Sequence, residues 1–303
     1  MCPRACGADR RHATGFCGAG AEPVLSRVSL HMWEEPCISG SKGAGTVFFS
    51  GCNLRCVYCQ NKEISRKPTG NRVSSGRLKE IFFELRDMGA VNIDLVTADI
   101  YLPSVREAVE AARREGLGLP FLLNTSSYVT VESLKSLEGL IDIYLPDFKY
   151  FHEADAQRYS GAGDYPTVAR LAIAEMVRQR PECVFSENGN GERLLKSGVL
   201  VRHLLLPGKL IAAKQTVKYL HENYGERIWI SLLNQYTPNG ELAGFPEIDR
   251  RLFGREYKSL VDHAVSLGIQ NAYVQSGEAA DEVYIPAFDG RGTQSCAKPH
   301  NAV

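Results

Sequence analysis

The sequence predicts an α/β fold arranged as a partial (β/α)6-type barrel, and two patterns support this prediction. From Gly45 onward, apolar runs of strand length alternate with segments whose apolar residues follow helical spacing. Short buried strands that alternate with amphipathic helices form parallel sheets with right-handed crossovers. The number of such strands approaches that of an eight-stranded barrel without reaching it, so we expect the barrel to remain open.

The individual elements follow from the same patterns. The expected strands are the apolar runs at 46–50, 91–97, 120–124, 141–145, 199–206, 228–233 and 272–275. The expected helices lie between them, at 76–88, 102–115, 131–137, 167–179, 212–224 and 255–267. The polar segment 183–196, rich in Gly and Asn, predicts a surface loop.

The chain divides into three parts by composition. Residues 1–44 form a Cys-rich N-terminal segment with many glycines and little periodicity, and residues 45–277 carry the predicted partial barrel. From 278 to 303 the alternation is lost, which predicts a tail that lies over the barrel.

Composition limits the class of protein. Of the 303 residues, 44% are hydrophobic and 23% charged, as in soluble globular proteins. Lys and Arg balance Asp and Glu at 35 each, so a nucleic-acid partner is not expected. No apolar stretch approaches the roughly 20 residues that span a bilayer, and the first residues lack the apolar core of a signal peptide. We therefore expect a cytoplasmic protein without a membrane partner. In such a protein, we expect the nine cysteines to serve as metal ligands and not to form disulfides.

Three of these cysteines form the most informative motif. Cys52, Cys56 and Cys59 directly follow the strand expected at 46–50, and active residues of parallel α/β proteins gather at such strand ends. Iron–sulfur clusters are normally held by four thiolates, so three thiolates without a local fourth would leave one iron open for a substrate. The alternatives are a zinc site completed by a distant His, or an electron-transfer cluster with a remote fourth Cys.

With its flanks, this motif resembles the signature of the radical S-adenosylmethionine (SAM) superfamily. More narrowly, the chain resembles uncharacterised relatives of pyruvate formate-lyase activating enzyme, in the stretches 33–40, 45–61, 142–150 and 201–208. The resemblance implies a radical SAM oxidoreductase with a [4Fe–4S] cluster on Cys52, Cys56 and Cys59 and with SAM on the open iron. One electron would cleave SAM to a 5′-deoxyadenosyl radical, which abstracts a hydrogen atom.

The resemblance also implies which residues bind SAM. Tyr58 would lie against the adenine. Asp147 and Lys149 match an Asp-x-Lys that faces SAM in activating enzymes, and alternation along a strand puts both on one face. Asn124, Thr125 and Ser126 suit the ribose hydroxyls, with simple turn chemistry as the alternative.

The end of the second barrel strand departs from the pattern of these relatives. They carry Thr-Pro-Thr-His where this chain has Thr97-Ala-Asp-Ile100. Asp99 would accept a hydrogen bond from the amino group of SAM, because hydrogen bonds to charged groups are strong. Its alternative role is to cap the helix that begins near Leu102.

Four further cysteines precede the barrel. Cys2, Cys6, Cys17 and Cys37 equal the number that a closed zinc site or an accessory iron–sulfur cluster uses, which makes them candidates for a second metal site. The Cys-x3-Cys spacing of the first two is less usual for zinc than Cys-x2-Cys.

Three functions remain open at this point. The first is an activating enzyme whose substrate is a glycyl radical enzyme, and the second is a radical SAM enzyme acting on another peptide or a small molecule. The third is a non-catalytic iron–sulfur or zinc protein. For either enzyme, the resemblance implies flavodoxin or ferredoxin as the reductant.

Overall fold

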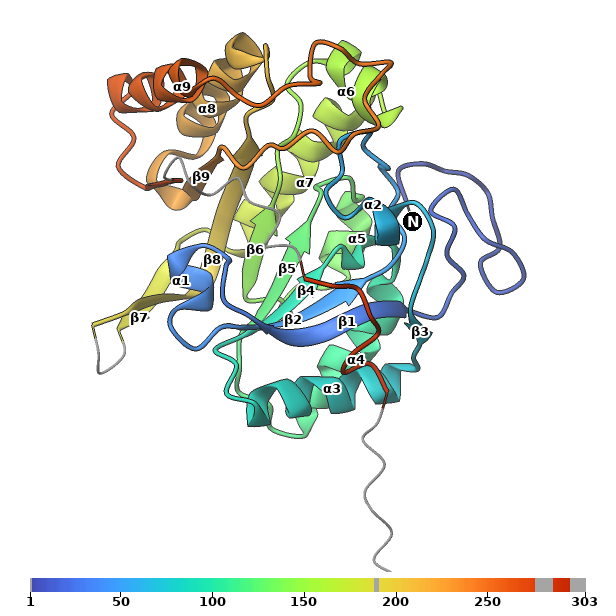
Figure 1. The fold of residues 1–303 in the computed structure, drawn as a ribbon. Helices are drawn as coiled ribbons and strands as arrows, with labels where there is room; N and C mark the ends of the chain where they lie inside the picture. The colour runs from blue at the N-terminus through green and yellow to red at the C-terminus, as the bar shows by residue number, and fades with distance from the viewer. Residues whose placement is uncertain (1, 188–190, 276–285, 295–303) are drawn as a thin grey trace, which may run out of the picture.

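The computed structural model describes residues 2–187, 191–275 and 286–294 (Figure 1). In these residues the strands are β1 (Val24–His31), β2 (Ala44–Phe49), β3 (Asn71–Arg72), β4 (Ile93–Val96), β5 (Phe121–Thr125), β6 (Ile143–Pro146), β7 (Val184–Glu187), β8 (Arg193–Leu204), β9 (Trp229–Leu233) and β10 (Ala272–Val274). The helices are α1 (Pro36–Ser39), α2 (Lys62–Ser65), α3 (Ser75–Asp87), α4 (Leu102–Arg114), α5 (Val131–Lys135), α6 (Glu153–Ser160), α7 (Tyr165–Gln179), α8 (Leu210–Tyr224) and α9 (Gly254–Ser266), with 3₁₀ turns η1 (Ala98–Ile100) and η2 (Gly225–Arg227).

The described strands form one open sheet in the order β10-β9-β8-β6-β5-β4-β2-β1-β3, with β7 paired to β8. Strands β2, β4, β5, β6, β8, β9 and β10 run parallel, whereas β1 is antiparallel to β2 and β3 is antiparallel to β1. The order runs from one edge to the other without closing, so the predicted partial barrel is confirmed. Each expected strand and each expected helix coincides with an observed element.

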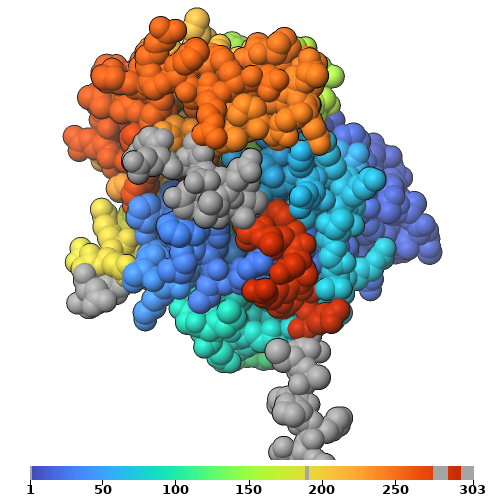
Figure 2. All heavy atoms as spheres, in the orientation of Figure 1, coloured from blue at the N-terminus to red at the C-terminus, as the bar shows by residue number. Residues whose placement is uncertain are grey.

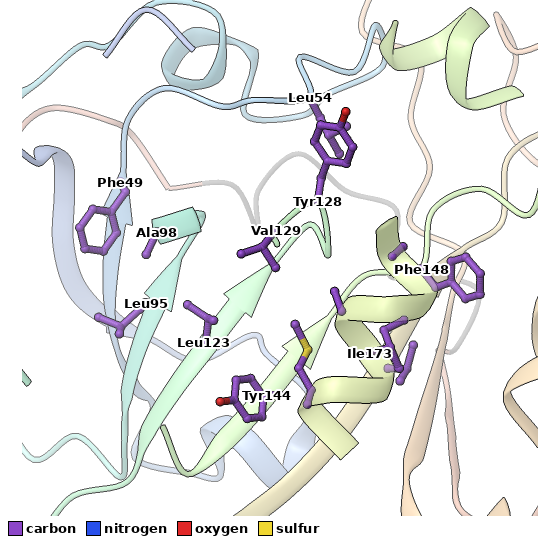
Figure 3. Close-up of a cluster of buried hydrophobic side chains, with 14 of the residues drawn as sticks. Phe49, Leu54, Leu95, Ala98, Leu123, Tyr128, Val129, Tyr144, Phe148 and Ile173 are labelled. Carbon is purple, nitrogen blue, oxygen red and sulfur yellow. The ribbon is translucent and has the colours of Figure 1, made fainter. Parts of the chain in front are cut away.

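The strands place alternate residues on the two faces of the sheet. Leu95, Leu123 and Tyr144, from β4, β5 and β6, belong to the main core, which the helices cover (Figure 3). Asp94, the residue before Leu95 in β4, points to the opposite face, into the barrel, where Glu34 and Arg202 are its charged neighbours. This alternation is why strands that are apolar on one face can carry polar groups toward a site on the other.

An apolar plug closes the amino-terminal end of the barrel. Ile38 of α1 packs with Leu122, Ile143 and Leu200, all fully buried. Ala44, the first residue of β2, belongs to the same cluster. The interior therefore changes from apolar at this end to polar toward the carboxyl ends of the strands.

Two sequence expectations are wrong. Residues 1–44 were expected to have little regular structure, yet Val24–His31 forms β1 beside β2. Its pattern is hidden because Ser26 is buried, and its hydroxyl donates to the Thr69 carbonyl over 2.9 Å. The expected loop at 183–196 contains β7 and the first residues of β8, which pair antiparallel. Strand β7 has one exposed and one half-buried residue on each face, so no burial pattern marks it.

The described part of the C-terminal tail, residues 286–294, lies against β1 (Figure 1). The Val28 amide donates to the Arg291 carbonyl over 2.9 Å, and the Gly290 amide donates to the Ser26 carbonyl over 2.8 Å. Gly292 has a φ of 76°, and a Cβ there would lie 2.6 Å from the Val28 carbonyl oxygen. The remaining tail positions lie outside the described residues.

In the part of the chain that the structure describes, no helix combines the length and the apolar character required to cross a bilayer.

Leu85→Ala tests the main core. Leu85 of α3 is fully buried in it, so we expect the free energy of unfolding to fall by about 2–5 kcal/mol. Urea denaturation measures the loss. The matched control is Leu171→Ala on α7, where 57% of the side chain is exposed and the expected change is about 0.5 kcal/mol or less. Equal losses in the two variants would contradict the assignment of the core.

Candidate active site

A cavity of about 280 Å³ lies at the carboxyl ends of the parallel strands. Its wall combines residues from the loop after β2, from the ends of β4, β5, β6, β8 and β9, and from the β1–β2 connection. The polar and sulfur-bearing lining residues that matter below are Glu34, Cys52, Cys56, Tyr58, Cys59, Asn124, Thr125, Ser126, Asp147, Lys149 and Arg202. The structure therefore brings together all but one of the residues predicted for the barrel site.

The loop after β2 carries the three thiols, and its backbone is held in an unusual path. Gly51 has a φ of 89°, and a Cβ there would lie 3.0 Å from the Cys17 carbonyl oxygen. Arg55 adopts a left-handed φ of 55°. The Cys59 amide donates to the Cys56 carbonyl over 3.1 Å, which closes the turn between these two cysteines.

Burial disfavours the charged forms of the Cys52 and Cys59 thiols. It raises the pKa of Cys52 to about 12, assisted by the nearby Cys56, and it raises the pKa of Cys59. A coordinating metal deprotonates a thiol outright. Buried thiols such as these can therefore become thiolates when a positively charged metal centre binds them.

The three thiols of the loop after β2 are the sulfur donors of the cavity. In the described residues, no three His, Cys, Asp or Glu side chains converge closely enough to hold a single ion. Cys52, Cys56 and Cys59 nevertheless line the same cavity, and no fourth cysteine is among its described lining residues. Three thiols at one cavity are the protein ligands that a cubane cluster with one open iron would use.

The end of β5 presents Asn124, Thr125 and Ser126 to the cavity. Thr125 Oγ1 accepts from the Ser127 amide over 3.0 Å, and Ser126 Oγ accepts from the Tyr128 amide over 3.3 Å. The Thr125 and Ser126 hydroxyls therefore stabilise the turn after β5, which was the alternative to a role in binding ribose. They also line the cavity, so the two roles do not exclude each other.

Asp147 and Lys149 lie together after β6, as alternation along the strand predicted. Lys149 Nζ lies 2.6 Å from Asp147 Oδ2, and Arg202 Nε lies 3.0 Å from Asp147 Oδ1. Burial alone would raise the pKa of Asp147, but the two cations hold that pKa below its ordinary value. Burial alone would lower the pKa of Lys149, and Asp147 raises it instead. Both side chains are therefore charged, and each is stabilised by the other.

Arg202 of β8 is the centre of this wall. Besides Asp147, its guanidinium donates to Glu34 Oε2 over 3.1 Å and to Asn124 Oδ1. Burial would lower its pKa, but Asp147 and Glu34 raise it. Glu34 was not predicted as a site residue, because it comes before the barrel strands and no spacing rule links it to Arg202. Its place within the resembling stretch 33–40 was the one available signal.

Asp99 is the predicted site residue that does not line the cavity. Its Oδ2 accepts from the Ser126 amide over 3.2 Å and from Ser126 Oγ over 3.1 Å, so it lies behind Ser126. The capping alternative is wrong, since α4 starts after Tyr101 without a side-chain cap. Burial raises the pKa of Asp99 to about 6, because Thr125 and Ser126 compensate only part of the lost hydration.

Tyr58 lines the cavity among other aromatic rings. It meets Tyr150, Tyr159 and Tyr236 edge-to-face, with ring centroids 6.0–6.4 Å apart. These contacts hold its ring in place, as a platform for a planar ligand requires.

The four N-terminal cysteines do not form one set. Cys37 lies in α1, within the apolar plug at the amino-terminal end of the barrel, so including it in a second metal site is wrong (Figure 1). Cys2, Cys6 and Cys17 belong to the segment that covers the thiol loop, where Arg4 donates to the Asn53 carbonyl over 2.7 Å. Cys6 is exposed, and backbone amides lower its pKa. A metal at these three remains a prediction.

Comparisons with known proteins agree with this geometry. Residues 46–185, from β2 into β7, match the family model described as the Radical SAM superfamily. This match covers less than half of the chain, and it includes the thiol loop and the ends of β4, β5 and β6 that line the cavity. An uncharacterized protein of Methanocaldococcus jannaschii is 26% identical over 281 residues, which cover 90% of this chain and 76% of that protein.

Two solved structures align with this chain. A radical SAM methyltransferase from Sphaerobacter thermophilus aligns with a TM-score of 0.52 at 16% identity, covering 77% of this chain and 66% of its own. Methylornithine synthase aligns with a TM-score of 0.49 at 14% identity, covering 74% of this chain and 60% of its own. The likeness to the methyltransferase supports the fold and says nothing of this chain's substrate.

Arg202→Met tests the charged wall. The change leaves Glu34 and Asp147 buried with Lys149 as the remaining cation, so we expect the free energy of unfolding to fall by about 3–5 kcal/mol. Adding Glu34→Gln should restore part of the loss. Arg106→Met, which removes an exposed α4 pair with Glu110, should cost about 1 kcal/mol or less. Strictly additive losses in the double variant would contradict the pairing.

Asp99→Asn tests the buried carboxyl through pH. The folded pKa of about 6 exceeds the ordinary value of 3.8, so the folded state binds the proton more tightly than the unfolded state. Stability from this group is present below about pH 4 and is lost as pH rises through 6. Urea titrations at pH 4 and pH 7 should show the wild type losing about 2–3 kcal/mol more than the variant. Parallel pH profiles would contradict the raised pKa.

Proposed function

We propose that this chain is a radical SAM enzyme that binds a [4Fe–4S] cluster through Cys52, Cys56 and Cys59, with one iron left for SAM. The observation that carries the proposal is that these thiols share one cavity with the polar residues at the ends of β5 and β6. When bound, such a cluster and SAM supply an electron and a source of a hydrogen-abstracting radical.

The side chains would divide the binding of SAM between them. Lys149 offers an ammonium group for a carboxylate; Asp147 pairs with that ammonium, and Arg202 in turn pairs with Asp147. Asn124 and Ser126 offer amide and hydroxyl groups for ribose, and Tyr58 offers an aromatic face. Asp99 would act through Ser126, since it orients this hydroxyl from behind.

For the reaction type, we propose activation of a glycyl radical enzyme, so that the substrate is a glycine on a loop of a partner protein. Two observations support this. Each of the four stretches that resemble activating-enzyme relatives contributes to the cavity, through Glu34, Cys52, Asp147 and Arg202 respectively. In addition, the described strands do not close into a full barrel, and a loop offered by a partner protein needs a lateral opening to reach the interior. A flavodoxin or ferredoxin would supply the electron.

Substituting the cysteines one at a time tests the enzyme class. We expect Cys52→Ala, Cys56→Ala and Cys59→Ala each to reduce 5′-deoxyadenosine formation after anaerobic reconstitution by at least about 100-fold, because the cluster loses a ligand. Cys183→Ala is the matched control, since its thiol is half-buried and lies near the Val199 carbonyl, away from this loop. Chromatography of the quenched reaction measures the product.

Two measurements, one on the wild type alone and one with an added partner, distinguish the candidate functions. Release of 5′-deoxyadenosine by the wild type supports a radical SAM enzyme, and a wild type that binds zinc or fully ligated iron overturns the proposal. A glycyl radical signal on an added partner, detected by electron paramagnetic resonance (EPR), supports the activating type. Turnover of a peptide or small molecule without that signal would replace it.

A further inference from the structure

One side chain outside the cavity reaches a cluster-binding thiol from behind. Ser160, the last residue of α6, has its Oγ 3.0 Å from Cys56 Sγ. The hydroxyl of Tyr150 lies 2.6 Å from the same Ser160 Oγ. Cys56, Ser160 and Tyr150 are all buried, with exposed fractions of 7%, 5% and 3%.

The direction of these two hydrogen bonds follows from counting protons. A thiolate bound to iron has no proton, so it can only accept, and Ser160 must donate its single proton to Cys56. Ser160 Oγ is then an acceptor toward Tyr150, whose hydroxyl donates to it. The result is a chain of two donors that ends on the sulfur.

The backbone holds Ser160 in this position. The Val57 amide of the thiol loop donates to the Tyr159 carbonyl over 2.8 Å, and Arg4 donates to the Ser160 carbonyl over 2.7 Å. Gly161, with a left-handed φ of 57°, ends the helix directly after it. The C-terminal turn of α6 is thus fixed against the loop from both sides.

We propose that Ser160, oriented by Tyr150, raises the reduction potential of the iron–sulfur cluster by donating a hydrogen bond to Cys56. Hydrogen bonds to the sulfurs and exposure to solvent are among the factors that set such potentials. The reduced cluster carries one more negative charge than the oxidised one, so a donor stabilises the reduced form more. Because the site is buried, the low local dielectric strengthens this effect.

The inference rests on the proposed function, because it requires a cluster on Cys56. Its test is therefore a measurement on the cluster and not on turnover. Ser160→Ala should lower the equilibrium constant for one-electron reduction about tenfold, a shift of about 59 mV to more negative potential. Tyr150→Phe should shift the potential in the same direction by less, and Ser160→Thr should keep the wild-type value.

The measurement is a potentiometric titration of the anaerobically reconstituted full-length protein, followed by the EPR signal of the reduced cluster, with iron and sulfide content determined for each variant. Ser26→Ala is the matched control. It also removes a buried serine hydroxyl, but one that donates to the Thr69 carbonyl, and it should leave the potential unchanged.

Each outcome decides a separate point. An unchanged potential in Ser160→Ala with full iron content overturns this inference and leaves the proposed function intact. A wild type that binds no cluster overturns both. If Ser160→Ala itself holds no cluster, Tyr150→Phe decides: a more negative potential supports the relay, and an unchanged one overturns it.

Discussion

The Arg202 guanidinium joins three otherwise separate parts of the barrel. Its partners are Asn124 at the end of β5, Asp147 after β6, and Glu34 in the connection between β1 and β2. Burying charges in this way costs solvation, which only a nearly complete set of partners offsets. The position of each cavity-facing group in this wall therefore depends on the others, and Lys149 is in turn held by Asp147.

The thiol loop is held from the opposite side. Its inner face meets the cavity, whereas its backbone is bound by Arg4 from the N-terminal segment and by the last turn of α6. Leu54, in the same loop, packs near Tyr128 above the strands (Figure 3). The N-terminal segment and the loop also adjoin at the molecular surface (Figure 2). These contacts leave Cys56 almost without solvent contact. A single hydrogen bond to its sulfur is therefore stronger than it would be in water.

Sequence reasoning was most successful where local patterns control structure. The Leu78–Leu85 periodicity predicted α3 because one helix face alone must be buried. The pair Asp147 and Lys149 was predicted to share a face because strand alternation has a fixed period of two. Sequence reasoning failed at β1, where a buried serine interrupts the apolar pattern, and at β7, where neither face is fully buried.

The sequence by itself determined the parallel sheet, the thiol loop at a strand end and the side chains of strands β5 and β6 that face it, because these depend on neighbouring residues and on element order. Only the tertiary structure decided that Glu34 meets Arg202, that Cys37 lies far from Cys2, and that Ser160 reaches Cys56. Each of these depends on how segments distant along the chain pack together, and spacing along a sequence carries no information about such contacts.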